Sequence, residues 1–258
     1  MYQELIRLIP IILPIVRKSA DFIRAEARSF DPEKIRFKTF NDFSSYVDQT
    51  SEEILVEGLS RILPGAGFIT EENTAGSSAN SLNWIIDPLD GTTNFLHGYP
   101  ATAVTLALKE NDEILLGVTC LLHEDAIYHA VKGNGAWCSD QRLTVSGTKD
   151  LEKSLLIPGF PYNLAGKDEE YFQLIRQLLS RCHGIRSSGA SAIDHSRNGA
   201  IKHTMVNCNN NRFFSVAEQF FQSNMLTSDH KIDFLRTKIS FSIKNTKTMQ
   251  KQLSSYFF

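Results

Sequence analysis

The N-terminal segment alternates apolar and charged positions in the pattern of an amphipathic helix. Charged residues between Arg17 and Arg28 separate the apolar positions, which are Ile15, Ala20, Phe22, Ile23 and Ala27, and this spacing predicts a helix with one packed face. The apolar run Leu5–Val16 contains Arg7 and two prolines, so it falls short of the roughly 20 residues that a transmembrane helix needs. No small-residue cleavage site of a signal peptide follows it. We therefore expect an N-terminal packing helix.

The next part of the chain predicts a mixed α/β arrangement. Apolar residues at helical spacing between Ile54 and Ile62 predict a second helix, capped by Asp48 or Ser51 and ended by Pro64-Gly65. Short apolar or alternating runs predict strands at 67–70, 84–86, 103–109, 113–122 and 126–131. Turns are expected at Asn111-Asp112 and at 133–135, and a further helix over 168–181.

Composition narrows the class of protein. The chain has 258 residues, of which 42% are hydrophobic and 22% are charged, so it can bury a core as one large domain or two small ones. A net charge of -2 offers no global basic field for nucleic acid or for an anionic membrane. Four widely spaced cysteines argue against a zinc ribbon or a disulfide framework, and a reducing cytoplasm is expected.

The composition changes near residue 195. Residues 195–258 hold 9 of the 27 basic residues but 3 of the 29 acidic ones, so this segment has a net charge of +6 and the preceding part a net charge of -8. The segment also contains Gly199 as its one glycine and no proline, although these residues punctuate turns in globular folds. We therefore expect a domain over 1–194 and a divergent tail over 195–258, with disorder as one alternative for the tail.

The strongest chemical signal is Trp-Ile-Ile-Asp-Pro-Leu-Asp-Gly-Thr-Thr-Asn-Phe, which runs from Trp84 to Phe95. An apolar strand leads directly into Asp87 and Asp90, and Pro88 is expected to turn the chain because its nitrogen cannot pair. Gly91, which follows Asp90, can begin a helix whose free N–H groups bind phosphate. Carboxylates beside a phosphate repel it unless a cation lies between them, and such hard oxygen ligands suit Mg²⁺.

Two other interpretations of this segment remain open. Aspartyl-phosphate phosphatases of the haloacid dehalogenase type also place aspartates after a strand, but their aspartates are two residues apart, whereas Asp87 and Asp90 are three apart. An ordinary strand-to-turn junction would account for any two of these residues. It does not readily explain the whole run from Asp87 to Asn94.

This run resembles the metal-binding signature of the inositol monophosphatase family, a Mg²⁺-dependent, lithium-sensitive phosphatase family. Upstream, Glu71-Glu72 resembles the family's Gly-Glu-Glu, with Thr70 in place of the glycine. The segment 43–49 resembles its Asp-x-x-x-x-x-Asp-x-x-x-Glu motif, with Phe43 at or beside the place of the first aspartate. Downstream, 132–137 and 184–192 resemble the family's Gly-x-Gly-Ala and Gly-x-Arg-x-x-Gly-Ser-Ala-Ala segments. The resemblance covers residues 1–194.

The resemblance implies a layered αβαβα sugar-phosphatase fold and a role for each matching residue. Glu71, Asp87, Asp90 and the Leu89 carbonyl would hold Mg²⁺. Thr92, oriented by Asp48, would position and activate water together with Glu71. The amides of Gly91 and Thr92 would hold the phosphate, with Asp90 beside them. Gly189, Ala190 and Ser191 would line the polyol side of the substrate.

One element of the family pattern is missing. The final metal carboxylate of the family lies in a Trp-Asp-x-Ala-Ala-Gly segment, and neither Trp84 nor Trp137, the chain's two tryptophans, stands in such a segment. Glu218 is the nearest acid by position but lacks this context. A frameshift, a premature gene end or a sequence error near codon 195 would each explain the loss. The C-terminal half is therefore expected to be incomplete or aberrant.

The sequence thus predicts a Mg²⁺-dependent phosphomonoesterase that acts on inositol monophosphate or a similar small sugar or polyol phosphate, with impaired activity in this chain. A relative that acts on fructose bisphosphate or on phosphoadenosine phosphates is one alternative. A catalytically dead remnant that binds metal or a partner is another. The resemblance implies a homodimer, and the charge balance predicts no nucleic-acid or membrane partner.

Overall fold

The computed structural model describes residues 2–29, 35–39, 42–72, 74–75, 80–111, 113–124, 126–144, 150–157 and 168–198. The described residues form two compact units. Unit 1 contains those up to Leu143 and 188–196, and unit 2 contains those of 144–187 and 197–198. The predictions for the tail fall almost entirely on residues 199–258, which lie outside the described residues. The boundary at 194 therefore stays a prediction.

A seven-stranded sheet forms the centre of unit 1, in the order β3-β4-β5-β6-β7-β8-β9. β3 lies parallel to β4, and every other neighbouring pair in this sheet is antiparallel. The strands are β3 (Gly67–Thr70), β4 (Leu82–Asp90), β5 (Ala103–Glu110), β6 (Glu113–Leu121), β7 (Ala126–Val131), β8 (Gly135–Cys138) and β9 (Gln141–Arg142). β3 and β7 have the predicted bounds. The sequence missed β8 and β9, as well as a separate antiparallel pair, β1 (Ile35–Thr39) and β2 (Asp42–Ser45).

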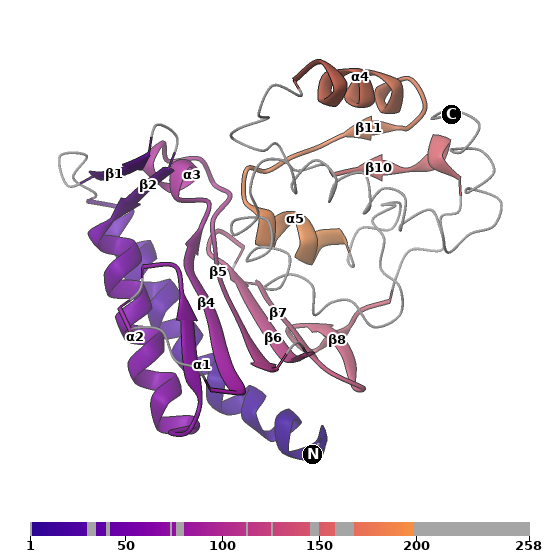
Figure 1. The fold of residues 1–258 in the computed structure, drawn as a ribbon. Coiled ribbons are helices and arrows are strands. Elements are labelled where there is room, and N and C mark those ends of the chain that lie inside the picture. Colours follow the sequence, from indigo (N-terminus) through magenta and orange to yellow (C-terminus); the bar gives the residue numbers. More distant parts are fainter. Residues whose placement is uncertain are drawn as a thin grey trace. The chain divides into compact units, whose positions relative to one another are not determined.

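Two helices, α1 (Tyr2–Glu26) and α2 (Tyr46–Ile62), pack side by side against the sheet (Figure 1). α1 buries one stripe at helical spacing, which consists of Leu5, Ile9, Ile12, Val16, Ala20 and Ile23. The predicted packing helix is therefore confirmed, and it begins earlier than its apolar pattern suggested, with Pro10 and Pro14 inside it. Within the described residues, no helix is both long and apolar enough to cross a membrane.

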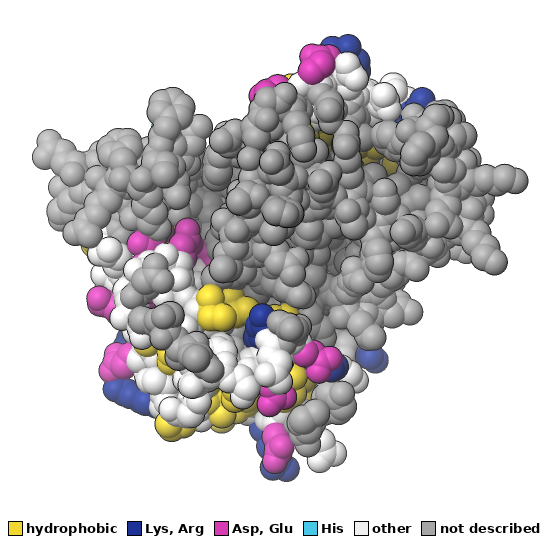
Figure 2. Space-filling view, in the orientation of Figure 1, with side chains coloured by type: hydrophobic (Ala, Val, Ile, Leu, Met, Phe, Trp, Pro, Cys, Tyr) yellow, Lys and Arg dark blue, Asp and Glu magenta, His cyan; other side chains and the backbone are white. Residues whose placement is uncertain are grey.

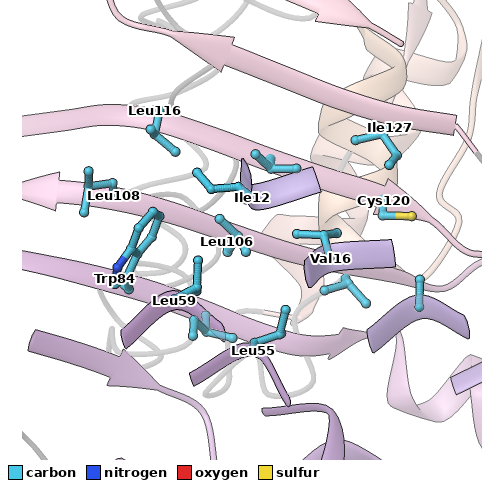
Figure 3. Packing of buried hydrophobic residues seen from close by; sticks show 14 of the residues in the cluster. Ile12, Val16, Leu55, Leu59, Trp84, Leu106, Leu108, Leu116, Cys120 and Ile127 are labelled. Atoms are coloured by element: carbon cyan, nitrogen blue, oxygen red, sulfur yellow. The ribbon is translucent and has the colours of Figure 1, made fainter. Parts of the chain in front are cut away.

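Side chains of opposite sheet faces enter two hydrophobic clusters. Figure 3 shows the larger cluster, where Trp84, Leu106 and Leu116 of the sheet meet Ile12 and Leu59 of the helices. Ala103, Leu121 and Tyr128 belong to a smaller cluster that includes Ala192 and Ile193 of α5 (Ser191–Asn198). Successive residues of a strand point to opposite faces. Val104 therefore belongs to the larger cluster and its neighbour Ala103 to the smaller one. The predicted α/β fold, with helices layered on a large sheet, is present.

Unit 2 contains short elements in its described part. A 3-10 helix, η2 (Leu151–Lys153), precedes β10 (Leu155–Leu156), which pairs in parallel with β11 (Gly184–Ile185). Along the chain, these two strands are separated by α4 (Asp168–Leu179), which ends two residues before the predicted end at 181. The short helix α3 (Thr92–Leu96) belongs to unit 1, where it follows β4.

Two local predictions were wrong, and tertiary contacts explain both. α2 begins at Tyr46, so Asp48 and Ser51 lie inside the helix, buried, and do not cap it. Both side chains instead make hydrogen bonds with residues that follow in the chain. Pro88 does not turn the chain, because β4 continues to Asp90 through an irregularity in its pairing with β5, and the turn comes at Gly91.

Adjacent isoleucines of α1 test the packed face of this helix. Ile12 is 0% exposed and Ile11 is 52% exposed, so Ile12→Ala is expected to lower the free energy of unfolding by about 2–5 kcal/mol. Ile11→Ala, its matched control, is expected to change it by less than about 0.5 kcal/mol. Urea denaturation followed by circular dichroism measures both variants. Equal destabilisation by the two substitutions would contradict the assigned helix face.

Candidate functional site

An extra residue in β4 brings Asp87 and Asp90 to the same face of the sheet. Asp87 pairs with Thr105 and Asp90 with Ala103, so three steps along β4 correspond to two steps along β5. Residues three apart in a regular strand point to opposite faces. The bulge at Pro88-Leu89 compensates for this odd spacing, because a bulge sets two residues against one partner position. The two carboxylates can therefore act together.

Side chains, rather than the neighbouring strand, bind the backbone groups of this bulge. The Ser51 hydroxyl donates to the Pro88 carbonyl at 2.9 Å. The Leu89 amide donates to Asp87 Oδ1 at 3.2 Å, and the Thr92 hydroxyl lies 3.1 Å from the Leu89 carbonyl oxygen. Pro88 has no N–H to satisfy. The bulge is thus compatible with burial.

Asp87 is the most unusual ionisable group of this unit. Its side chain is 0% exposed, and Oδ2 has no hydrogen-bond donor among the described residues. Burial raises the pKa of Asp87 well above its ordinary value, and the nearby negative charges of Glu71, Asp90 and Asp48, together with a side-chain hydrogen bond to Glu71, raise it further. A buried carboxylate in such surroundings is either protonated or neutralised by a cation. Asp87 is therefore the centre of the candidate site.

Asp90 links the end of β4 to the start of α5. Its Oδ1 accepts a hydrogen bond from the Ser191 amide at 3.2 Å, and its Oδ2 accepts one from the Ala192 amide at 2.7 Å. Burial raises the pKa of Asp90 to about 7, although these amides oppose the rise. Both oxygens keep further lone pairs. Asp90 thus holds the segment that the sequence assigned to the polyol side, and its predicted metal role stays a prediction.

Gly91 joins β4 to α3 in a conformation that favours glycine. Its φ of 88° lies in the left-handed region, and a Cβ atom built there would lie 2.7 Å from the Ala101 carbonyl oxygen. The same atom would lie 3.1 Å from Ala190 Cβ. The predicted phosphate-binding turn at Gly91 and the predicted substrate segment at Ala190 are therefore direct neighbours.

Thr92 and Asp48 meet as the sequence predicted. The Thr92 hydroxyl lies 3.1 Å from Asp48 Oδ1, and Asp48 is buried in the first turns of α2. One hydroxyl proton serves either Asp48 or the Leu89 carbonyl oxygen at the same distance. Asp42, at the start of β2, lies six residues before Asp48, which is the spacing of the family motif. The first aspartate of that motif is therefore present, and Phe43 stands beside it.

Sequence reasoning missed the role of Glu52. Glu71 follows β3 and is half-buried, and the segment behind it is attached to α2 by Glu52, which is fully buried. Glu52 accepts hydrogen bonds from the Glu72 amide at 2.7 Å and from the Thr74 amide at 2.8 Å. The final glutamate of the motif that includes Asp48 could have identified it. Glu52 thus secures the loop that carries the predicted ligand Glu71.

Asn94 also escaped the sequence analysis. Its Nδ2 donates to the carbonyl oxygens of Ala101 at 2.7 Å and of Ser188 at 2.9 Å. Gly189, with a φ of 79°, passes so close that a Cβ atom would lie 3.0 Å from Asn94 Oδ1. Asn94 therefore holds the turn that includes Gly189 and Ala190 beside α3. No spacing in the sequence signals a contact between residues so far apart.

The donor set around Asp87 fits a hard divalent cation in its chemistry. In this conformation, no three His, Cys, Asp or Glu side chains of the described part of the chain are grouped so as to enclose a metal ion. The unpaired oxygen of Asp87, the adjacent negative charge of Glu71 and the Leu89 carbonyl are nevertheless oxygen ligands of the kind that Mg²⁺ takes. The predicted ligands Glu71, Asp87, Leu89 and Asp90 thus belong to one neighbourhood, and their coordination of a metal stays a prediction.

Comparisons with known proteins identify the family of this chain. A model of the inositol monophosphatase family matches residues 6–196. The putative Nus factor SuhB of Neisseria meningitidis serogroup B is 36% identical over 179 residues, which are 69% of this chain and 69% of that protein. An inositol-1-monophosphatase of Mesorhizobium japonicum is 36% identical over 162 residues, or 62% of this chain and 61% of that protein.

Structural comparison gives the same result. The crystal structure of the extragenic suppressor protein suhB from Bartonella henselae matches with a TM-score of 0.68 and 29% identity, covering 74% of each chain. This likeness confirms the predicted fold class. Since the family model spans residues 6–196 and relatives share 36% of the aligned residues, the chain belongs to the inositol monophosphatase family.

Proposed function

We propose that this protein is a Mg²⁺-dependent phosphomonoesterase that hydrolyses inositol monophosphate or a similar small sugar or polyol phosphate. The observation that carries this proposal is the buried carboxylate of Asp87, which has an unpaired oxygen and lies among the charges of Glu71, Asp90 and Asp48. Such surroundings favour binding of a cation, because an ionised Asp87 carboxylate without a counter-charge is unfavourable there. Membership of the inositol monophosphatase family supports the phosphate ester as substrate.

In this proposal, Mg²⁺ would be held by Glu71, Asp87, Asp90 and the Leu89 carbonyl. When bound, Mg²⁺ would lower the pKa of the attacking water and stabilise the leaving oxygen. The chain's own residues provide orientation. Thr92, in contact with Asp48, holds the water in line with phosphorus, and Glu71 accepts its proton.

The substrate is held by the backbone and by the neighbouring turn. The amides of Gly91 and Thr92 bind phosphate oxygens, as free amides at the start of a helix do. Gly189, Ala190 and Ser191 border the polyol, since Asp90 and Asn94 attach this segment to the end of β4 and to α3. This placement makes the substrate's hydroxyl groups neighbours of Asp90.

Substrate assays separate the proposal from its alternatives. Fructose bisphosphate or phosphoadenosine phosphate hydrolysis would identify a relative with a similar metal core. Mg²⁺ binding without phosphate release would identify a remnant that has lost turnover. The relatives named Nus factor SuhB show that the names given within this family extend beyond phosphatases, so activity has to be measured on this chain.

For partners, we propose a homodimer in the cytoplasm and no nucleic-acid or membrane partner. On the face seen in Figure 2, acidic and basic side chains of the described residues are interspersed, without separation by sign. Together with the net charge of -2, this distribution predicts little non-specific affinity for polyanions such as nucleic acids. Salt-sensitive retention of the protein on RNA or DNA would contradict this proposal, and light scattering would measure its oligomeric state.

The central carboxylate gives the first test of the activity. Asp87→Asn removes the negative charge at the centre of the proposed Mg²⁺ ligands, so phosphate release should fall by at least about 10²-fold. Asp21→Asn, which alters a carboxylate that is 72% exposed on α1, is the matched control and should keep wild-type activity. Wild-type turnover by Asp87→Asn, or by the wild type in excess chelator, would contradict the metal assignment.

Thr92 gives an independent test of water positioning. Thr92→Val keeps the shape of the side chain but removes the hydroxyl that contacts Asp48, and kcat should fall by about 10²-fold or more. Thr92→Ser retains the hydroxyl and should keep most of the activity. Steady-state phosphate release at saturating Mg²⁺ measures both. Equal kcat values for Thr92→Val and Thr92→Ser would remove the hydroxyl from the mechanism.

The absent Trp-Asp segment predicts weak binding of a second metal. One site can draw Glu71, Asp87 and Leu89 O, whereas the other keeps Asp87 and Asp90, and Mg²⁺ gives up its waters reluctantly. A chimera with an intact family C-terminal half after Ala192 should therefore hydrolyse inositol monophosphate faster, by about 10²-fold, and at lower Mg²⁺. Identical rates and half-saturating Mg²⁺ concentrations for the chimera and this chain would show that the lost carboxylate is dispensable or replaced.

A further inference from the structure

We infer that Ser51 is a positioning residue that orients the Asp87 carboxylate through the peptide group between Pro88 and Leu89. The inference rests on the proposed function for its metal readout. Its structural basis is independent of that function. It assigns a role to a buried serine that the family motifs leave unassigned.

A chain of three polar groups links both helices to the bulge. Ser19 of α1 and Ser51 of α2 are fully buried, and their Oγ atoms lie 2.7 Å apart. Ser51 Oγ also lies 2.9 Å from the Pro88 carbonyl oxygen. A carbonyl can only accept, so the Ser51 proton points to Pro88, and Ser19 is the donor in the serine pair. The direction of both hydrogen bonds is thereby determined.

The same peptide group is held at its other end. Its carbonyl oxygen belongs to Pro88 and accepts from Ser51, while its N–H belongs to Leu89 and donates to Asp87 Oδ1. Because a peptide group is planar and rigid, fixing its oxygen also fixes the direction of its N–H. Ser51 therefore helps to fix the orientation of the Asp87 carboxylate, which accepts a hydrogen bond from this N–H.

The consequence for the site concerns the second oxygen of Asp87. With Oδ1 engaged by the Leu89 amide, Oδ2 is left without a donor among the described residues. The Leu89 carbonyl follows on the next peptide group of the same bulge. Ser51 thus helps to present two of the proposed Mg²⁺ ligands from a segment that lacks regular pairing with β5. Groups that orient metal ligands in this way typically affect metal affinity.

Ser51→Ala and Ser19→Ala form a matched pair for the experiment. Both remove one fully buried hydroxyl from the same hydrogen-bonded pair, but Ser51→Ala alone breaks the bond to Pro88. Hydrogen exchange of the Leu89 amide, followed by NMR in metal-free full-length protein, reports on the bulge. Calorimetric Mg²⁺ titration reports on the ligands, and melting temperature reports on general stability.

Ser51→Ala should accelerate exchange at the Leu89 amide and weaken Mg²⁺ binding by about 10-fold. Ser19→Ala should lower the melting temperature but keep wild-type exchange at Leu89 and wild-type Mg²⁺ affinity. Unchanged Leu89 exchange in Ser51→Ala would overturn the inference, as would equal effects of the two variants on Mg²⁺ affinity. Should Ser51→Ala prevent folding, Ser51→Cys, which keeps a weak donor of similar shape, replaces it with the same expected directions.

The two readouts separate this inference from the proposed function. Faster Leu89 exchange in Ser51→Ala, combined with no Mg²⁺ binding by the wild type, would support the positioning of the bulge and refute the metal-dependent function. Faster exchange with wild-type Mg²⁺ affinity in Ser51→Ala would instead overturn the link from Ser51 to the ligands.

Discussion

The odd spacing of Asp87 and Asp90 along β4 is the constraint on which the site depends. A regular strand would send the two carboxylates to opposite faces of the sheet, one toward the core under the helices. The extra residue at Pro88-Leu89 avoids this outcome, as the pairing of Asp87 with Thr105 and of Asp90 with Ala103 shows. The bulge also releases backbone groups from the sheet, and side chains from α2 and α3 bind them. Local irregularity and long-range support are therefore parts of one arrangement.

This arrangement has an electrostatic cost. Three carboxylates raise the pKa of Asp87 in addition to the effect of its burial, and their mutual repulsion in a poorly solvated site opposes folding. The two hydrophobic clusters on either side of the sheet supply stabilisation that can offset it. A cation bound among these carboxylates would offset their repulsion, because a ligand that binds the folded state stabilises that state.

Side chains outside the proposed ligand set also organise the site through their hydrogen bonds. Glu52 secures the loop that follows Glu71, whereas Asn94 and Ser51 each bind backbone carbonyls of segments remote in sequence. Family membership gives these residues a common fold, but activity depends on the chemistry of the site. The relatives carry names as different as inositol-1-monophosphatase and Nus factor SuhB. The state of the carboxylate cluster in this chain is therefore the decisive feature.

The sequence by itself determined the fold class and the family, because short-range signals encode them. The strands at 67–70 and 126–131 follow from local apolar patterns, and the run from Asp87 to Asn94 is contiguous. Such patterns predicted a cap at Asp48 or Ser51 and a turn at Pro88, and both predictions were wrong. The tertiary structure alone decided that Asp87 and Asp90 share a face, that Ser51 binds Pro88 across 37 residues, and that Asp90 binds Ala192 across 102 residues. These outcomes depend on strand register and on packing between distant segments, which local propensity does not specify.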